Sequence, residues 1–157
     1  MTNDDGWILG AYGPPLTPDI MREKMIESYK GSPVDVFLWS IGGHETYDYE
    51  TEIGEMLGDG YDDLDEATQK RRDNTRFLID NHVGPVTVIA QLCHQAGMRF
   101  FPSVRMNEHY DMEESAPNYG RVRREHPELL IGKPGEKMPY PSREWGIRTG
   151  LDYATDG

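Results

Sequence analysis

The chain has 157 residues, the length of one ordinary domain, and its three Trp, nine Tyr and four Phe argue against disorder. A single cysteine excludes an internal disulfide framework and a multi-cysteine zinc site. The net charge of −12 disfavours nucleic acids and anionic membrane surfaces as partners, because clustered Lys and Arg bind phosphate groups. The sequence also has no signal-peptide pattern, and its apolar runs are too short for a membrane span, so we expect a cytoplasmic protein.

The first quarter of the chain predicts a βαβ unit. The apolar run at 7–12 (Trp-Ile-Leu-Gly-Ala-Tyr) predicts a short buried strand. Thr17 followed by Pro18 is typical of a helix start, and apolar residues recur at every fourth position after it. The run at 34–41 is rich in β-branched and aromatic residues, which predicts a strand of a parallel sheet.

An acidic stretch interrupts this rhythm. Residues 45–66 contain ten acidic residues and no Lys or Arg, and glycines punctuate the middle. The stretch lacks the ordered Asp spacing of a calcium-binding loop. We therefore expect a solvated loop that leads into a helix from about Asp62 to Asn81.

The α/β alternation then resumes once and stops. A helix is expected over 86–96 and a third strand over 98–104, although a proline inside that strand disfavours a central position. Beyond it we expect a long loop with a short helix at 121–126 and a small hairpin that pairs 129–131 with 150–154. A TIM barrel needs eight βα units, so the predicted fold class is α/β, a partial (β/α)8 TIM barrel. Residues 1–157 would be the N-terminal part of that single domain.

Arg105, Asn107 and His109 are the strongest candidates for a binding site. If the third strand continues through them, they share one face, because side chains alternate along a strand. They also lie at its C-terminal end, where parallel barrels place their active sites. Their mixture of donors and acceptors suits a polyhydroxylated ligand. The alternative is that they only satisfy loop backbone groups.

A second group follows the second strand. His44 comes directly after Gly42 and Gly43, again at a C-terminal strand end. A divalent metal would have as ligands His44, Glu45, Glu108 and His109. Their spacing matches no tight metal motif, so we predict no metal and no other cofactor.

Trp39 and Asp152 are further candidates. Trp39 lies inside the second strand and would serve either as core filler or as the floor of a sugar pocket. Asp152 lies near the expected mouth, where it would bind substrate, order the loop or cap a following helix.

Several short segments together resemble the glycosyl-hydrolase-like 10 family, bacterial TIM-barrel proteins assigned to glycoside hydrolysis. The segments are Trp7-Ile-Leu9, Val36-Phe-Leu-Trp39, Phe100-Phe-Pro-Ser-Val-Arg-Met-Asn107, Glu125-His-Pro-Glu-Leu-Leu130 and Gly150-Leu-Asp-Tyr153. The most specific parts are His-Pro-Glu-Leu-Leu and Leu-Asp-Tyr-Ala. The acidic stretch does not map onto the family.

The resemblance implies a carbohydrate substrate and places the catalytic carboxylates on a fourth strand, beyond residue 157. We therefore expect this chain alone to be inactive and poorly stable, with Phe37, Trp39 and Phe101 exposed to water for lack of the remaining strands. Two alternatives stay open. One is a metal-dependent sugar isomerase or epimerase barrel, and the other is a carbohydrate-binding barrel without catalysis.

Overall fold

The computed structural model describes residues 1–43, 45–106, 114–132 and 150–154. Its centre is a parallel sheet of three short strands in the order β1 (Thr2–Asp4), β2 (Val36–Ser40) and β5 (Arg99–Ser103). The parallel direction confirms the predicted α/β class, and the chain is a mixed α/β fold. The strand with the internal proline, β5, lies at an edge of the sheet. The described residues form no closed barrel.

The prediction that residues 7–12 form the first strand is wrong. Trp7–Ala11 is the short helix α1, and Thr2–Asp4 supplies the strand instead. The chain turns between them at Gly6, which has a φ of 75° and donates its N–H to the Asp4 carboxylate over 2.8 Å. The consecutive residues Ile8 and Leu9 are both fully buried, because α1 packs against α3. A short apolar run fits either a buried strand or a buried helix, and the polar Thr-Asn-Asp carries no strand signal.

Capping signals place the next helix as predicted. The Thr17 hydroxyl accepts the Ile20 N–H over 3.3 Å at the start of α2 (Pro18–Met21). The helix then widens into the π-helical turn η1 (Arg22–Ile26) and closes as the 3₁₀ turn η2 (Glu27–Tyr29).

Helices α3 (Glu66–Asn81) and α4 (Pro85–Gln95) confirm the two later predictions, although α3 begins after Asp65 rather than near Asp62. Asn74 anchors α3 to the segment that leaves α1. Its fully buried amide donates to the Leu9 and Tyr12 carbonyls over 2.9 and 2.8 Å, and its oxygen accepts the Leu16 N–H over 2.8 Å.

We expect Asp65→Ala to lower the free energy of unfolding by about 1 kcal/mol, because Asp65 is the N-cap of α3. Its carboxylate accepts the N–H groups of Ala67 and Thr68 over 2.9 and 3.1 Å. Hydrogen bonds from the Thr68 side chain and backbone hold the pKa of Asp65 below 3.8. The stabilisation of α3 by the Asp65 carboxylate is therefore complete when the pH is above the ordinary pKa of Asp. It is lost as the pH falls through the lowered pKa of Asp65.

Urea denaturation at neutral pH and in acid measures the effect of Asp65→Ala. Asp62→Ala is the control, since Asp62 is exposed and precedes the helix. Equal losses in the two variants at neutral pH would contradict the capping role of Asp65.

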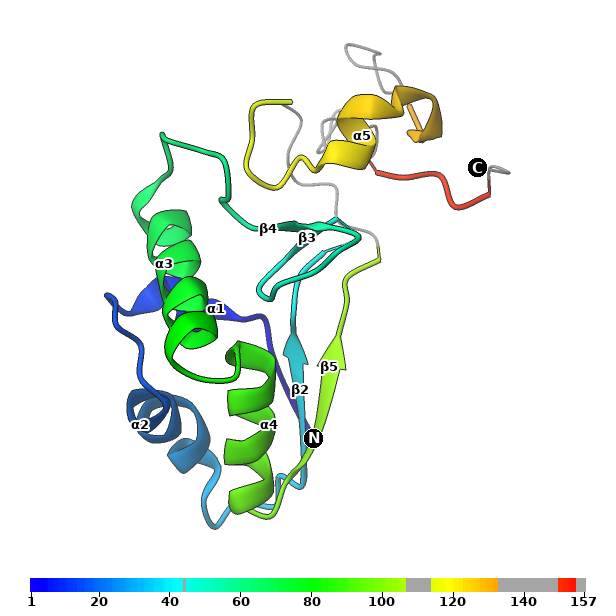
Figure 1. Ribbon diagram of the computed structural model, residues 1–157. Coiled ribbons are helices and arrows are strands. Elements are labelled where there is room, and N and C mark those ends of the chain that lie inside the picture. Colours follow the sequence, from blue (N-terminus) through cyan, green and yellow to red (C-terminus); the bar gives the residue numbers. More distant parts are fainter. Residues whose placement is uncertain (44, 107–113, 133–149, 155–157) are drawn as a thin grey trace, which may run out of the picture.

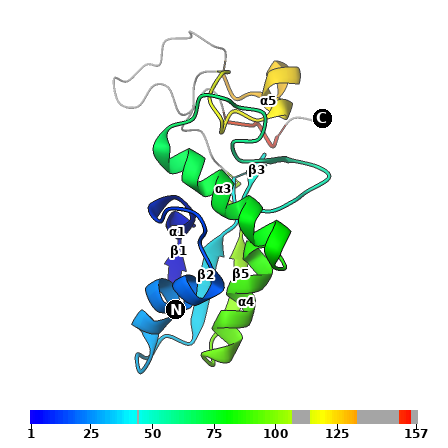
Figure 2. The same ribbon diagram turned by 60° about the vertical axis from the view of Figure 1, so that its left-hand side comes forward.

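Helices α1 to α4 cover one face of the sheet, and no described helix covers the other (Figure 1, Figure 2). Phe37 and Trp39 face the helices and are fully buried, so the expectation that they are exposed is wrong. Phe101 lies opposite Leu38 on the other face and is 50% exposed, as expected. The apolar core is thus a single layer between the helices and the sheet.

The acidic stretch is not the solvated loop that its composition predicts. It contains two short parallel strands, β3 (Thr46–Tyr47) and β4 (Glu55–Met56). Figure 1 shows them beyond the carboxyl ends of β2 and β5, next to α5 (Arg121–Glu125). Its acids pair with arginines of α3 and α5, in the pairs Glu45–Arg123, Asp48–Arg71, Glu55–Arg124 and Asp59–Arg76. Arginines that are distant in sequence therefore let two of these acids, Glu45 and Asp48, be buried.

The remaining segments agree with the sequence in outline. The short helix predicted at 121–126 is α5, and the turn η3 (Pro127–Leu129) follows it. The predicted hairpin is present as one antiparallel bridge between Leu130 and Leu151, flanked by two backbone hydrogen bonds. Within the described part of the chain, no helix has both the length and the apolar character that crossing a membrane requires.

Candidate functional site

The loops that follow β2 and β5 are held side by side at the carboxyl edge of the sheet. The Ile41 N–H donates to the Ser103 carbonyl over 2.9 Å, so the pairing of the two strands extends past their ends. One step further, the Arg105 N–H donates to the Gly42 carbonyl over 3.1 Å. Arg105 is therefore positioned by its own backbone against the glycine pair that follows β2.

A small polar cavity of about 90 Å³ lies at this edge. We call the residues that line it the edge site: Asp5, Ser40, Gly42, Gly43, Thr46, Asp48, Leu57, Arg71, Arg105 and Asn118. They come from the ends of β1, β2 and β5, from the acidic stretch, from α3 and, in the case of Asn118, from the loop before α5. Two ion pairs dominate the edge site, one at its rim and one in its floor.

The rim pair joins Asp5 to Arg105. The Arg105 guanidinium lies 2.5 Å from the Asp5 carboxylate, and both side chains are about half exposed, at 42% and 56%. Asn3 donates its side-chain N–H to the same carboxylate over 3.1 Å. The hydrogen bond from Arg105 is the main reason why the pKa of Asp5 is lowered, so Asp5 is ionised at neutral pH.

The floor pair joins Asp48 to Arg71. The guanidinium donates two hydrogen bonds, of 2.6 and 2.5 Å, to a carboxylate that is 1% exposed. Burial raises the pKa of Asp48, and the charge and hydrogen bonds of Arg71 oppose that rise. A Cβ on Gly6 would lie 3.0 Å from the Arg71 guanidinium, so the glycine leaves room for this pair. The Asp48–Arg71 pair is therefore a structural part of the edge site, and the half-exposed Asp5–Arg105 pair offers its donors and acceptors to a ligand.

Of the three site residues predicted at the end of the third strand, one lies within the described part of the chain. Arg105 is in the edge site beside Gly42, as the strand-end argument anticipates. Asn107 and His109 lie outside the described residues, and so does His44. Whether these side chains converge on Arg105 stays a prediction.

Trp39 and Asp152 do not line the edge site. Trp39 is fully buried in the core, where its indole N–H has no hydrogen-bond partner among the described residues. The Asp152 carboxylate accepts the Ala154 N–H over 3.0 Å and so orders its own turn.

Glu45 is the only member of the proposed metal-ligand set within the described residues, since Glu108 is also outside them. Its carboxylate accepts the N–H groups of Gly120 and Arg123 over 3.1 and 2.8 Å and the Arg123 side chain over 2.5 Å. Among the described residues, no group of three or more His, Cys, Asp or Glu is placed to hold a metal ion.

Four residues of the edge site are not predicted from the sequence: Asp5, Asp48, Arg71 and Asn118. Asp5 had a usable signal, because it follows a strand end just as Arg105 does. The prediction of a first strand at 7–12 hides that signal, because it places Asp5 before the strand instead of after it. Asp48 and Arg71 are separated by 23 residues and join only through the fold.

Comparison with known proteins does not assign the chain to a family. No family model matches the chain, and no curated protein gives a significant match. The family resemblance of the short segments therefore stays a prediction.

Proposed function

We propose that the chain is the N-terminal part of a carbohydrate-active TIM-barrel protein, a glycoside hydrolase, and that the edge site binds part of its sugar substrate. The observation that carries the proposal is the Asp5–Arg105 pair beside Gly42 and Gly43, at the common carboxyl edge of three parallel strands. Parallel barrels place their substrate sites at this edge.

The chemistry of the rim pair suits a sugar. Neighbouring hydroxyls both donate and accept hydrogen bonds, and a guanidinium beside a carboxylate offers both partners in a fixed arrangement. The cavity of about 90 Å³ is small compared with a complete ligand pocket, which typically measures ~300–1,000 Å³. We therefore assign the edge site to one part of the substrate, with the remainder of the pocket formed by further strands and loops.

The uncovered face of the sheet supports the proposed TIM-barrel fold. Parallel sheets are normally covered on both faces, and in a TIM barrel the inner face packs against the side chains of the other strands. Here Phe101 is half exposed on the face that bears no described helix. Glycoside hydrolysis also needs two carboxylates that flank the scissile bond. Asp5 and Asp48 are both paired with arginines, so we assign catalysis to carboxylates on later strands.

We expect saccharide binding by the chain to depend on Arg105. Nuclear magnetic resonance titration with a panel of mono- and disaccharides should show weak, saturable binding, and Arg105→Met should weaken it by about tenfold, the loss of one charged hydrogen bond. Arg99→Met is the matched control, because Arg99 forms a similar exposed pair with Asp35, 2.9 Å long, at the other end of the same strands.

Two outcomes test the sugar site and the assignment of catalysis separately. Equal weakening by Arg105→Met and Arg99→Met, or no binding of any saccharide, would contradict a sugar site at the edge. With a panel of aryl glycosides we expect no turnover by residues 1–157. Measurable turnover would contradict the assignment of catalysis to later strands.

A further inference from the structure

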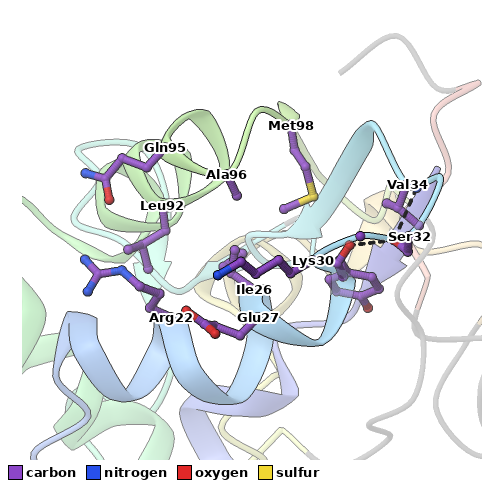
Figure 3. A pocket seen from close by; sticks show the side chains of 12 residues that line it. Arg22, Ile26, Glu27, Lys30, Ser32, Val34, Leu92, Gln95, Ala96 and Met98 are labelled. Carbon is purple, nitrogen blue, oxygen red and sulfur yellow. Dashed lines mark hydrogen bonds between the residues drawn. The ribbon is translucent and has the colours of Figure 1, made fainter.

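A larger cavity, of about 470 Å³, lies near the amino-terminal ends of β2 and β5, whereas the edge site lies at their carboxyl ends. Figure 3 shows the side chains that line this larger cavity. Its walls are the turns η1 and η2 with the loop that leads into β2, and the last turn of α4. This volume is within the range of small-molecule pockets. π-Helical turns such as η1 are rare and often mark functional sites.

The cavity has an apolar floor. Ile26, Leu92 and Met98 are each at most 5% exposed, and Val34 extends the same surface. In Figure 3 the Leu92 and Met98 side chains point from the α4 side towards Ile26. An apolar group of a few carbons would bury its surface here.

The rim of the cavity is charged and only partly paired, since Arg22, which also lines it, bonds to Asp19 over 2.7 Å. Lys30, Glu27 and Gln95 line the cavity, and their side chains form no hydrogen bond or ion pair with any described residue. By contrast, Glu23 and Lys24 on the same helical segment bond to each other over 2.6 Å and do not line the cavity. A cation and an anion above an apolar floor therefore remain available to a ligand.

We infer that this cavity binds a free α-amino acid with an apolar side chain, such as leucine or methionine. The ligand carboxylate pairs with the Lys30 ammonium, and the ligand ammonium pairs with the Glu27 carboxylate. α4 ends at Gln95 in the same wall, and the partial negative charge of its C-terminus also favours the ligand ammonium. The ligand side chain packs on Ile26, Leu92 and Met98.

Isothermal titration of the chain with L-leucine tests the inference, and we expect saturable binding. Lys30→Met and Glu27→Gln should each weaken it by about tenfold, equivalent to ~1.4 kcal/mol. The matched controls Lys24→Met and Glu23→Gln should leave it unchanged, because these residues lie outside the cavity. All four side chains are on the surface, and circular dichroism verifies that each variant is folded.

Two analogues identify the contacts. Leucinamide lacks the carboxylate and should lose its dependence on Lys30, whereas N-acetyl-leucine lacks the ammonium and should lose its dependence on Glu27. The inference is overturned if wild-type chain shows no saturable binding well into the millimolar range. Equal binding of leucine and both analogues would also overturn it, since apolar adsorption alone would then explain the signal.

Discussion

Replacement of Arg123 by methionine is expected to lower the free energy of unfolding by about 3–5 kcal/mol, because it leaves the carboxylate of Glu45 buried without its cation. The two side chains are 1% and 3% exposed and lie 2.5 Å apart. Arg123 also donates to the Asn118 carbonyl and lies over the Tyr119 ring, 4.4 Å from its centroid. One substitution therefore removes the buried ion pair between α5 and the acidic stretch, whereas the more exposed Glu55–Arg124 pair remains.

Urea denaturation of a double-mutant cycle isolates this pair. Glu45→Gln alone should also destabilise, and the Glu45→Gln/Arg123→Met double variant should recover part of the loss, because it leaves no buried charge. Arg99→Met is the control for an exposed pair and should change the free energy by less than about 1 kcal/mol. A similarly small loss for Arg123→Met would show that the buried pair is not what stabilises this part of the chain.

Gly42→Ala is the second large effect that we expect. Gly42 has a φ of 142°, and a Cβ there would lie 2.3 Å from the Thr46 carbonyl oxygen and 2.7 Å from the Tyr47 Cα. The backbone strain and the contact each cost about 1–3 kcal/mol, so we expect a total loss of roughly 2–6 kcal/mol. The variant should also lose the saccharide binding that we propose for the edge site, since the Gly42 carbonyl positions Arg105.

Gly13→Ala is the matched control for this substitution. A Cβ on Gly13 meets no atom within 4 Å, and its φ is not positive. Thermal unfolding of both variants by circular dichroism gives the comparison. If Gly42→Ala is as stable as Gly13→Ala, the close approach of the Gly42 loop to Thr46 is not present in solution.

Local signals predicted most of the fold. The N-cap Thr17 with Pro18 marks a helix start in a few residues of sequence, and the structure confirms it. The run around Val36–Ser40 had the composition of a buried strand and is one. The strand prediction for residues 7–12 is wrong because a short apolar run is compatible with either a strand or a helix. Packing against α3 stabilises the helix.

Long-range pairing could not be predicted from one sequence. Glu45 and Arg123 are 78 residues apart, and composition alone made the acidic stretch look solvated. The same limit applies to the edge site. Arg105 is predictable because it follows a strand, and strand ends are recognisable in a sequence. Arg71 lies on a helix, and only the folded chain brings it to Asp48 and the edge site.

The open sheet has a consequence for the behaviour of the chain in concentrated solution. Within the described part, β1 and β5 each have one edge without a neighbouring strand, and such edges are templates for strands of other molecules. The net charge of −12 keeps copies apart by mutual repulsion, and dissolved salt screens that repulsion over about 10 Å at 0.1 M. Colloidal stability of the chain should therefore decline as ionic strength rises, in contrast to proteins whose sheets are fully enclosed.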